Sequence, residues 1–225
     1  MSNITFEPAR NRRGYKITIM VDDPDSWIWP WAKILEKTIA PYHDVRLVSN
    51  KTEMNKGDFA FLLGCIQIIP KCFLENHKYN IVAHESALPL GRGWSPLSWQ
   101  VLEGKNIIPI VLFDAREELD SGPIYMQDII KLNGNELLDE IKRKQGLKTI
   151  ELFCRFLERW PDLVPIEQKG NPTFYPRRNI EDDKIDEHKT IAENFNHLRI
   201  VDNEKYPAWF QYKGRKYKIK ICPYD

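Results

Sequence analysis

The feature that most constrains this chain is the alternation of short apolar runs with segments of helical periodicity. Six runs rich in β-branched or aromatic residues are expected to be strands, at 16–21, 45–48, 59–63, 79–84, 107–113 and 123–132. Expected helices lie between and after them, at 30–40, 71–75, 95–103, 136–143 and 148–160. Such alternation predicts an α/β fold: a Rossmann-like, mostly parallel sheet with helices on both faces.

The turn after the first expected strand argues against a dinucleotide cofactor. No Gly-x-Gly-x-x-Gly motif follows that strand; Asp22, Asp23 and Asp25 follow it instead. Their carboxylates would repel the pyrophosphate that such sites bind at a helix N-terminus. A nicotinamide or flavin site is therefore not expected.

The composition changes near Pro161. Residues 167–190 are polar and charged, which is typical of a connector laid over a surface. Apolar residues then recur at helical spacing over 191–201, and two further segments flank Lys213-Gly214-Arg215, which indicates a hairpin. A helix and one hairpin are too small to be stable alone. We therefore expect an N-terminal catalytic domain over 1–165, with a C-terminal connector, helix and β-hairpin over 166–225 packed on it.

Charge and cysteine usage limit the expected partners and compartment. The 33 basic and 32 acidic residues give a net charge of +1, which creates no general field to capture nucleic acid or anionic membranes. No apolar run is long enough to span a bilayer, and the first residues lack the apolar core of a signal peptide. The 4 cysteines show neither paired nor zinc-site spacing, so we expect no metal and a cytoplasmic protein with reduced thiols.

His84 and Asp120 are the strongest candidates for chemistry. His84 ends an expected strand, and Asp120 lies in a loop between two expected strands. Each also has a purely structural interpretation, as a buried histidine bonded to a carbonyl or as a turn aspartate before Ser121-Gly122. Both lie at strand ends of one sheet, however, where loops converge and α/β proteins bind ligands. A carboxylate beside an imidazole can fix its tautomer, raise its pKa and accept a proton.

Aromatic and basic residues outside these loops are weaker candidates. Trp27, Trp29 and Trp31 follow the first strand and could stack on a ligand, although packing in the core is the simpler interpretation. Arg177 and Arg178 could grip a phosphate, whereas charged connectors usually face water. Neither a serine nucleophile elbow nor a P-loop occurs in the sequence.

A longer pattern surrounds the two main candidates. The chain has HESALP at 84–89, GRG at 91–93, Pro96 and Trp99, and DSG at 120–122. This resembles the formyltransferases that use N10-formyltetrahydrofolate, whose motif is Asn-x-His-x-Ser-Leu-Leu-Pro, then Arg-Gly, a helix, and later Asp-x-Gly. The resemblance covers roughly residues 58–130. The tail, with YPRRN at 175–179 and VDN at 201–203, is similar to the branch that formylates nucleotide-linked amino sugars. Sugar formyltransferases of surface-polysaccharide and pseudaminic-acid-type pathways look most similar.

The resemblance implies transfer of a formyl group from N10-formyltetrahydrofolate, as co-substrate, to the amine of a UDP- or dTDP-linked 4-amino-4,6-dideoxyhexose. His84 would act as the base or stabilise the oxyanion, and Asp120 would orient His84 and relay a proton. Folate contacts are expected from Cys65, Ile68, Pro70, Phe113, Asp114 and Leu119. Acceptor contacts are expected from Asp22, Asp23, Trp27, Ser86, Arg92, Gly93 and Arg178. Family members are often dimers, so the resemblance allows a homodimer, although the hydrophobic surface does not decide it; neither nucleic acid nor a membrane is expected as partner.

One departure from the family motif affects the chemistry. The family's asparagine lies two residues before the histidine, where this chain has Val82, which has no side-chain donor for an oxyanion. Asn80 lies about 13 Å from His84 along an extended strand and cannot replace it without a bulge. A replacement donor is expected from Ser86, Ser95, Gln100, Asn106 or a backbone N–H near Gly91. The alternatives are a catalytically impaired module that binds folate or a nucleotide sugar, or a formyltransferase for methionyl-tRNA or a purine precursor.

Overall fold

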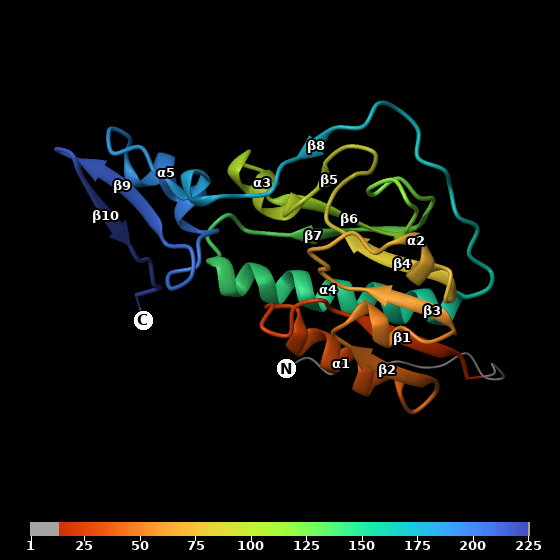
Figure 1. The fold of residues 1–225 in the computed structure, drawn as a ribbon. Coiled ribbons are helices and arrows are strands. Elements are labelled where there is room, and N and C mark those ends of the chain that lie inside the picture. Colours follow the sequence, from red (N-terminus) through yellow and green to blue (C-terminus); the bar gives the residue numbers. More distant parts are fainter. Residues whose placement is uncertain (1–13, 225) are drawn as a thin grey trace.

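The structure is a computed structural model that describes residues 14–224, and its centre is a six-stranded sheet (Figure 1). The strand order is β2–β1–β3–β4–β6–β7. Strands β2 (Asp44–Val48), β1 (Lys16–Met20), β3 (Gly57–Leu62) and β4 (His77–His84) are parallel. Strands β6 (Ile107–Asp114) and β7 (Ile124–Lys131) each run antiparallel to the strand before them in the sheet. The expected α/β fold with a mostly parallel sheet is confirmed, and each of the expected strands is present.

Helices cover both faces of the sheet, as expected. Helices α1 (Trp29–Ile39) and α4 (Leu138–Arg159) pack together on one face, where strand residues such as Ile19 and Phe61 join them in the main core (Figure 1). Alternate strand residues, among them Met20 and Leu62, face the other way and pack with the short helix α2 (Lys71–Leu74). Both sets are apolar because a strand with two covered faces has no solvent side. Helix α3 (Pro96–Leu102) follows the loop after β4, and one-turn 3₁₀ helices lie at Lys51–Glu53 and Ile180–Asp183.

Helix α4 differs from the expectation of two helices at 136–143 and 148–160. It is one helix of 22 residues that runs through Gly146. A Cβ atom at Gly146 would lie 2.4 Å from the ring of Trp31 on α1. The glycine therefore does not end the helix; it lets α1 and α4 approach closely. A packing glycine and a helix-ending glycine look the same in the sequence, which explains the error.

The connector and the C-terminal segment lie against the α/β body. The connector pairs with the loop after β4, because β8 (Phe174–Tyr175) runs parallel to β5 (Arg92–Gly93). It then leads past α3 to helix α5 (Ile191–Leu198) and the hairpin of β9 (Ala208–Tyr212) and β10 (Arg215–Ile219), which lie beyond the start of α4 (Figure 1). A separate small cluster of Ile185, Leu198, Val201 and Ala208 forms the core of this segment.

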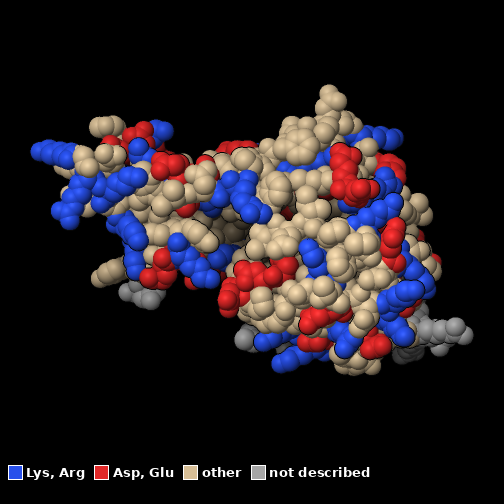
Figure 2. Space-filling model, in the orientation of Figure 1, with Lys and Arg blue, Asp and Glu red and all other residues tan. Residues whose placement is uncertain are grey.

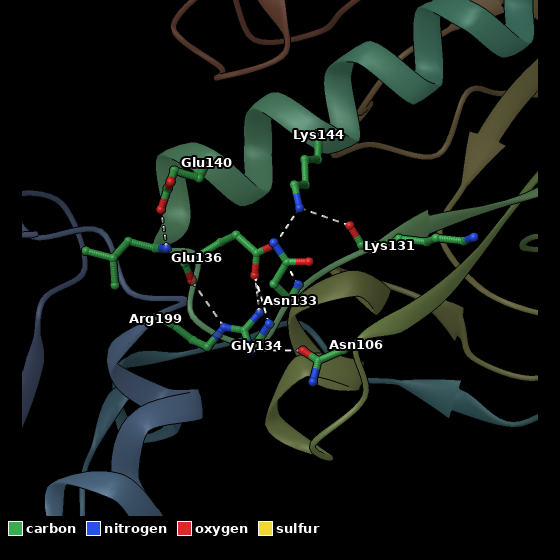
Figure 3. Close-up of polar contacts among 9 residues, drawn as sticks. Asn106, Lys131, Asn133, Gly134, Glu136, Glu140, Lys144 and Arg199 are labelled. Atoms are coloured by element: carbon green, nitrogen blue, oxygen red, sulfur yellow. Dashed lines mark hydrogen bonds and ion pairs between the residues drawn. The ribbon is translucent and has the colours of Figure 1, made fainter.

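A buried ion-pair cluster joins this segment to the body (Figure 3). Arg199, which is 1% exposed, follows α5. Its guanidinium lies 3.3 Å from a carboxylate oxygen of Glu136, donates to the Glu136 carbonyl at 3.2 Å, and donates to Asn106 Oδ1 at 3.0 Å. The Glu136 carboxylate also accepts hydrogen bonds from the Lys144 ammonium and the backbone N–H of Asn133. We call these residues the Arg199 cluster.

Candidate active site

A pocket of about 500 Å³ lies outside the carboxyl ends of the parallel strands. Its wall comes from the segments after β1, β3 and β4, from the segment after β6, and from the side of α4 at Gln145 and Thr149. Tyr206 of the C-terminal segment also lines it. This is where α/β sheets place their ligands, and the volume suits a small-molecule site.

His84 and Asp120 meet in the wall of this pocket. His84 is the last residue of β4, and Asp120 lies in the segment between β6 and β7. The imidazole Nδ1 lies 3.8 Å from a carboxylate oxygen of Asp120, and both side chains are nearly buried. That separation is too long for a direct hydrogen bond, but it lies within reach of one bridging group. The convergence of these two loops, expected from the sequence, is present in the structure.

The contact on the other ring nitrogen defines the tautomer of His84. Nε2 lies 2.8 Å from the carbonyl oxygen of Gly91, which can only accept a hydrogen bond. A neutral His84 therefore carries its hydrogen on Nε2 and a lone pair on Nδ1. Two acceptors, the Nδ1 lone pair and the Asp120 carboxylate, then face each other. The space between them favours a group that brings protons, such as an amine.

Asp120 is held by its backbone and by a hydrogen bond from the loop after β4. It has a left-handed conformation, with φ of 49°, and one carboxylate oxygen accepts the Gly93 N–H at 2.8 Å. The chain must also turn tightly at Gly122, where a Cβ atom would lie 1.6 Å from the carbonyl oxygen of Asp114. The DSG sequence at 120–122 therefore forms a turn that aims a carboxylate at the histidine.

Val82 lies in the pocket wall, two residues before His84 on the same strand face. Asn80 does not replace the missing donor, because its amide donates to the Leu74 carbonyl at 3.1 Å and β4 continues without a bulge. Of the side chains expected to supply a donor, Ser95 lines the pocket. The other candidates lie elsewhere. The Gln100 amide donates to the Glu85 and Pro96 carbonyls, and Asn106 belongs to the Arg199 cluster. Ser86 is buried, and the backbone N–H of Gly91 donates to the Thr173 hydroxyl.

The expected folate contacts fall into two groups. Four line the pocket, namely Cys65, Ile68, Phe113 and Leu119. Burial raises the pKa of the Cys65 thiol to about 12, so this sulfur is a neutral wall atom and not a nucleophile. Pro70 and Asp114 lie outside the wall. Pro70 precedes α2, and the Asp114 carboxylate accepts the Asn80 N–H at 2.8 Å.

The expected acceptor contacts divide in the same way. Those in the wall are Asp23, Trp27 and Gly93. The other charged ones hold neighbouring segments: Asp22 accepts the N–H groups of residues 66 and 67, Arg92 pairs with Glu118 at 2.7 Å, and Arg178 pairs with Asp183. Ser86 is buried and lies outside the wall. Trp29 and Trp31 are partly buried against the main core.

Glu85, Gln145, Thr149 and Tyr206 are among the wall residues that sequence reasoning missed. Glu85 adjoins His84 and carried a usable signal, because it is a charged residue at the end of a buried strand. Gln145, Thr149 and Tyr206 lie far along the chain and reach the pocket only through tertiary packing. Within residues 14–224, no three His, Cys, Asp or Glu side chains are grouped as they would be around a metal ion. In the same range, no helix has the length and apolarity that crossing a membrane needs.

Comparison with known proteins identifies the family. The chain belongs to the formyltransferase family, because the family model described as formyl transferase matches residues 39–155, about half of the chain. A methionyl-tRNA formyltransferase of Thermodesulfovibrio yellowstonii is 28% identical over 145 residues, which cover 63% of this chain and 47% of that protein. This chain spans about half the length of the curated relatives it matches.

Several solved structures share the fold, and two of those described below are named formyltransferases. The methionyl-tRNA formyltransferase from Clostridium thermocellum has a TM-score of 0.77 at 22% identity and is covered over 93% of both chains. A 4-N formyltransferase from Francisella tularensis has a TM-score of 0.72 at 19% identity, over 92% of this chain and 97% of that one. HypX from Aquifex aeolicus in complex with tetrahydrofolic acid has a TM-score of 0.73 at 17% identity, over 92% of this chain and 37% of that one. The fold is thus shared by proteins with different names, and the name methionyl-tRNA formyltransferase conflicts with our expectation of no nucleic-acid partner.

Proposed function

We propose that the chain transfers a formyl group from N10-formyltetrahydrofolate to the amine of a nucleotide-linked 4-amino-4,6-dideoxyhexose. The observation that carries this proposal is the meeting of His84 and Asp120, 3.8 Å apart, in a pocket of a chain that belongs to the formyltransferase family. A serine hydrolase would need a nucleophile elbow, and a dehydrogenase would need a dinucleotide site. This pocket instead offers two proton acceptors facing each other.

The pocket suits a reduced folate. Its wall between β3 and β6 is apolar, with Leu62, Val82 and Phe113 among its side chains, and the loop at residues 64–69 contributes the facing edge. A flat heterocycle fits between such surfaces, and backbone groups of a loop can bond its polar edge. When bound, N10-formyltetrahydrofolate supplies an activated formyl carbon to an attacking amine.

His84 and Asp120 handle the proton in this reaction. The Nδ1 lone pair of His84 takes a proton from the attacking nitrogen, while the Nε2–H group keeps donating to the Gly91 carbonyl and fixes the ring. The Asp120 carboxylate on the other side stabilises the imidazolium that forms. The Gly93 N–H holds the Asp120 carboxylate in turn, so the imidazole and the carboxylate keep their relative positions although they make no direct hydrogen bond.

The proposal for the acceptor rests on the part of the pocket wall that comes from the segment after β1 and from the C-terminal segment. Trp27 and Tyr206 offer rings on which a sugar or a base can stack, and Asp23 can bond sugar hydroxyls or an amine. Structures named as a 4-N formyltransferase and a sugar N-formyltransferase share this fold over 92% of the chain. The tail similarity found in the sequence supports the same acceptor. The domain division at 165, the cytoplasmic location and the homodimer remain part of this proposal.

Methionyl-tRNA is the second candidate acceptor. It is the acceptor named for the curated relatives. Exposed Lys and Arg side chains also gather on the C-terminal hairpin, at the far left of Figure 2, where Lys213, Arg215, Lys216 and Lys218 lie. A basic surface of that kind favours contact with a phosphate backbone.

One assay separates the acceptors. The full chain is incubated with N10-formyltetrahydrofolate and, in parallel, with aminated dTDP- and UDP-sugars or with methionyl-tRNA, and each acceptor is tested for the mass of one added formyl group. Formylated sugar nucleotide is the expected product. Product from methionyl-tRNA alone would overturn the sugar proposal. Tight folate binding without product from any acceptor would instead indicate a binding module. The Asp120→Asn variant serves as control: it keeps an acceptor for the Gly93 N–H but loses the charge, so it should bind folate and turn over slowly.

A further inference from the structure

Glu85 is a pocket residue that the mechanism above does not use. It follows His84 directly, is half-buried, and lines the pocket. One carboxylate oxygen accepts a hydrogen bond from the side-chain amide of Gln145, on α4, at 2.8 Å. Its main-chain carbonyl accepts a hydrogen bond from Gln100, on α3, at 2.5 Å. Two helices therefore fix both the backbone and the side chain of Glu85 at the edge of the cavity.

The charged groups around Glu85 make the pocket acidic. His84 and Asp120 are the titratable groups that interact with its carboxyl, and α3 and α4 face it with the neutral amides of Gln100 and Gln145. Asp23 lines the same pocket from the segment after β1. Among residues 14–224, the wall contains one arginine, whose guanidinium is paired with Glu167 at 2.6 Å. None of these described wall residues neutralises Glu85, which suits a cationic ligand group.

The mechanism above assigns no residue to the removal of the first proton from the acceptor's ammonium group. An aliphatic amine with a pKa of about 8 or higher is mostly an ammonium ion near neutral pH, and it carries three hydrogens. The formamide product keeps one of them and the departing folate nitrogen takes another. One proton must therefore leave the ammonium before attack, because a nitrogen without a lone pair cannot form the new bond. His84 can relay the second proton, but it cannot also hold the first.

We propose that Glu85 binds the ammonium group of the acceptor and takes its first proton, and that His84 takes the second; this rests on the proposed function. The proton passes from nitrogen to the Glu85 carboxylate. The freed lone pair forms the bond to the formyl carbon, whose C=O electron pair moves to oxygen. His84 Nδ1 then removes the second proton and delivers it to N10 as the carbon–N10 bond breaks and the C=O bond re-forms. Glu85 returns its proton to water.

Burial supports this role, because it raises the pKa of the Glu85 carboxyl, against the opposing effects of the Gln145 hydrogen bond and His84. A carboxylate with a raised pKa is the stronger base, and a general base works best with a pKa near the working pH. Proton transfer within the pocket also replaces an ion pair by two neutral groups, which a poorly solvated site favours.

The test is the pH dependence of kcat/KM for formyl transfer by the full chain, between about pH 6 and about pH 9, with the sugar-nucleotide acceptor. At the acidic end, we expect Glu85→Gln to lower kcat/KM about 10-fold or more, because the variant can use only acceptor molecules whose amine is already neutral in solution. At the alkaline end, where most of the amine is neutral, kcat/KM should approach the wild-type value. Tetrahydrofolate affinity, followed by tryptophan fluorescence, should not change. The matched control is Glu117→Gln, which removes an exposed carboxylate from outside the wall and should keep the wild-type profile.

A second variant leaves Glu85 in place. Gln145→Met removes the hydrogen bond that favours the carboxylate, so the pKa of Glu85 rises further and the acidic limb of the profile should move to higher pH. A Glu85→Gln variant that matches the wild type, or loses activity equally at every pH, would overturn this role. An inactive wild type would overturn the proposed function itself, and the role of Glu85 with it.

Discussion

Two buried charged groupings in this molecule are built in opposite ways. In the Arg199 cluster, Arg199 is 1% exposed and Glu136 5% exposed, and each charge has several partners (Figure 3). In the pocket, His84 is also buried and Asp120 is largely buried, but they face each other at 3.8 Å without a direct bond. The charged groups of the Arg199 cluster bond one another and their neighbours directly, whereas the pocket pair makes no direct bond between its members and, in the proposed mechanism, bonds a ligand. Burial therefore does not by itself distinguish the two kinds of grouping; the bonds already made between the charges do.

The largest expected effect breaks the pocket pair. His84→Gln keeps an N–H that can donate to the Gly91 carbonyl but removes the Nδ1 base. We expect kcat/KM for formyl transfer to fall by about 10²–10⁴-fold, which is the usual contribution of general base catalysis. The unfolding midpoint in urea should stay close to that of the wild type, because the pair makes no direct bond to lose. A variant that retains activity within about 10-fold would remove His84 from the mechanism.

The matching change in the Arg199 cluster should act on stability. Glu136→Ala leaves the Arg199 guanidinium buried without its carboxylate, which typically costs about 3–5 kcal/mol of unfolding free energy. Urea unfolding measures this, and kcat of the molecules that remain folded should be near the wild-type value. The control is Glu140→Ala, which removes an exposed carboxylate that caps the backbone at Leu137 and should cost about 1 kcal/mol. Equal losses in the two variants would contradict this view of the cluster.

The sequence predicted the pocket pair better than the cluster. His84 and Asp120 lie within a motif whose turn residues place both loops, so order and spacing along the chain were enough to bring them together. Glu136 and Arg199 are 63 residues apart, and Glu85 and Gln145 are 60 apart, with no motif around either contact. The first contact depends on how the residue after α5 meets the residues before α4, and the second on how α4 lies beside the end of β4, which composition and periodicity do not encode.

The same limit explains the error at α4. The alternation of apolar runs predicted every strand of the six-stranded sheet, because strand burial repeats along the chain itself. It did not predict the two-residue strands β5 and β8, which pair across a long sequence separation. Gly146 is a glycine because Trp31 of another helix approaches it, and that approach is invisible in the local pattern. Elements were therefore predictable from local periodicity, and the loops of the site from their motif. Contacts between distant elements had to be observed.

The pH dependence of stability sharpens the comparison further. Burial alone would raise the pKa of Glu136, but hydrogen bonds from Lys144 and from the backbone N–H groups of Asn133 and Gly134 outweigh it and lower the pKa from 4.5 to about 2. A depressed folded-state pKa contributes stability that is present above about pH 4.5 and is lost as the pH falls toward 2. We expect a loss of about 2–3 kcal/mol over that window. In Glu136→Gln the unfolding free energy should fall less steeply there; an unchanged slope would assign the acid sensitivity to other carboxyls.

The smallest expected effect comes from a substitution that adds a hydrogen-bond donor to the pocket instead of removing one. Val82→Asn places an amide in the wall two residues before His84, at the position where the family motif has asparagine. One oxyanion donor is worth about 10²–10³-fold in rate when its geometry is right, and an amide introduced into a wall shaped for valine should recover only part of this, about 10-fold in kcat. Folate affinity should change little, because the new bond strengthens as charge develops on the formyl oxygen. A rate equal to that of the wild type would mean that another donor already bonds this oxygen. In that case Ser95 is the expected donor, and Ser95→Ala, which removes its hydroxyl from the same wall, should lower kcat.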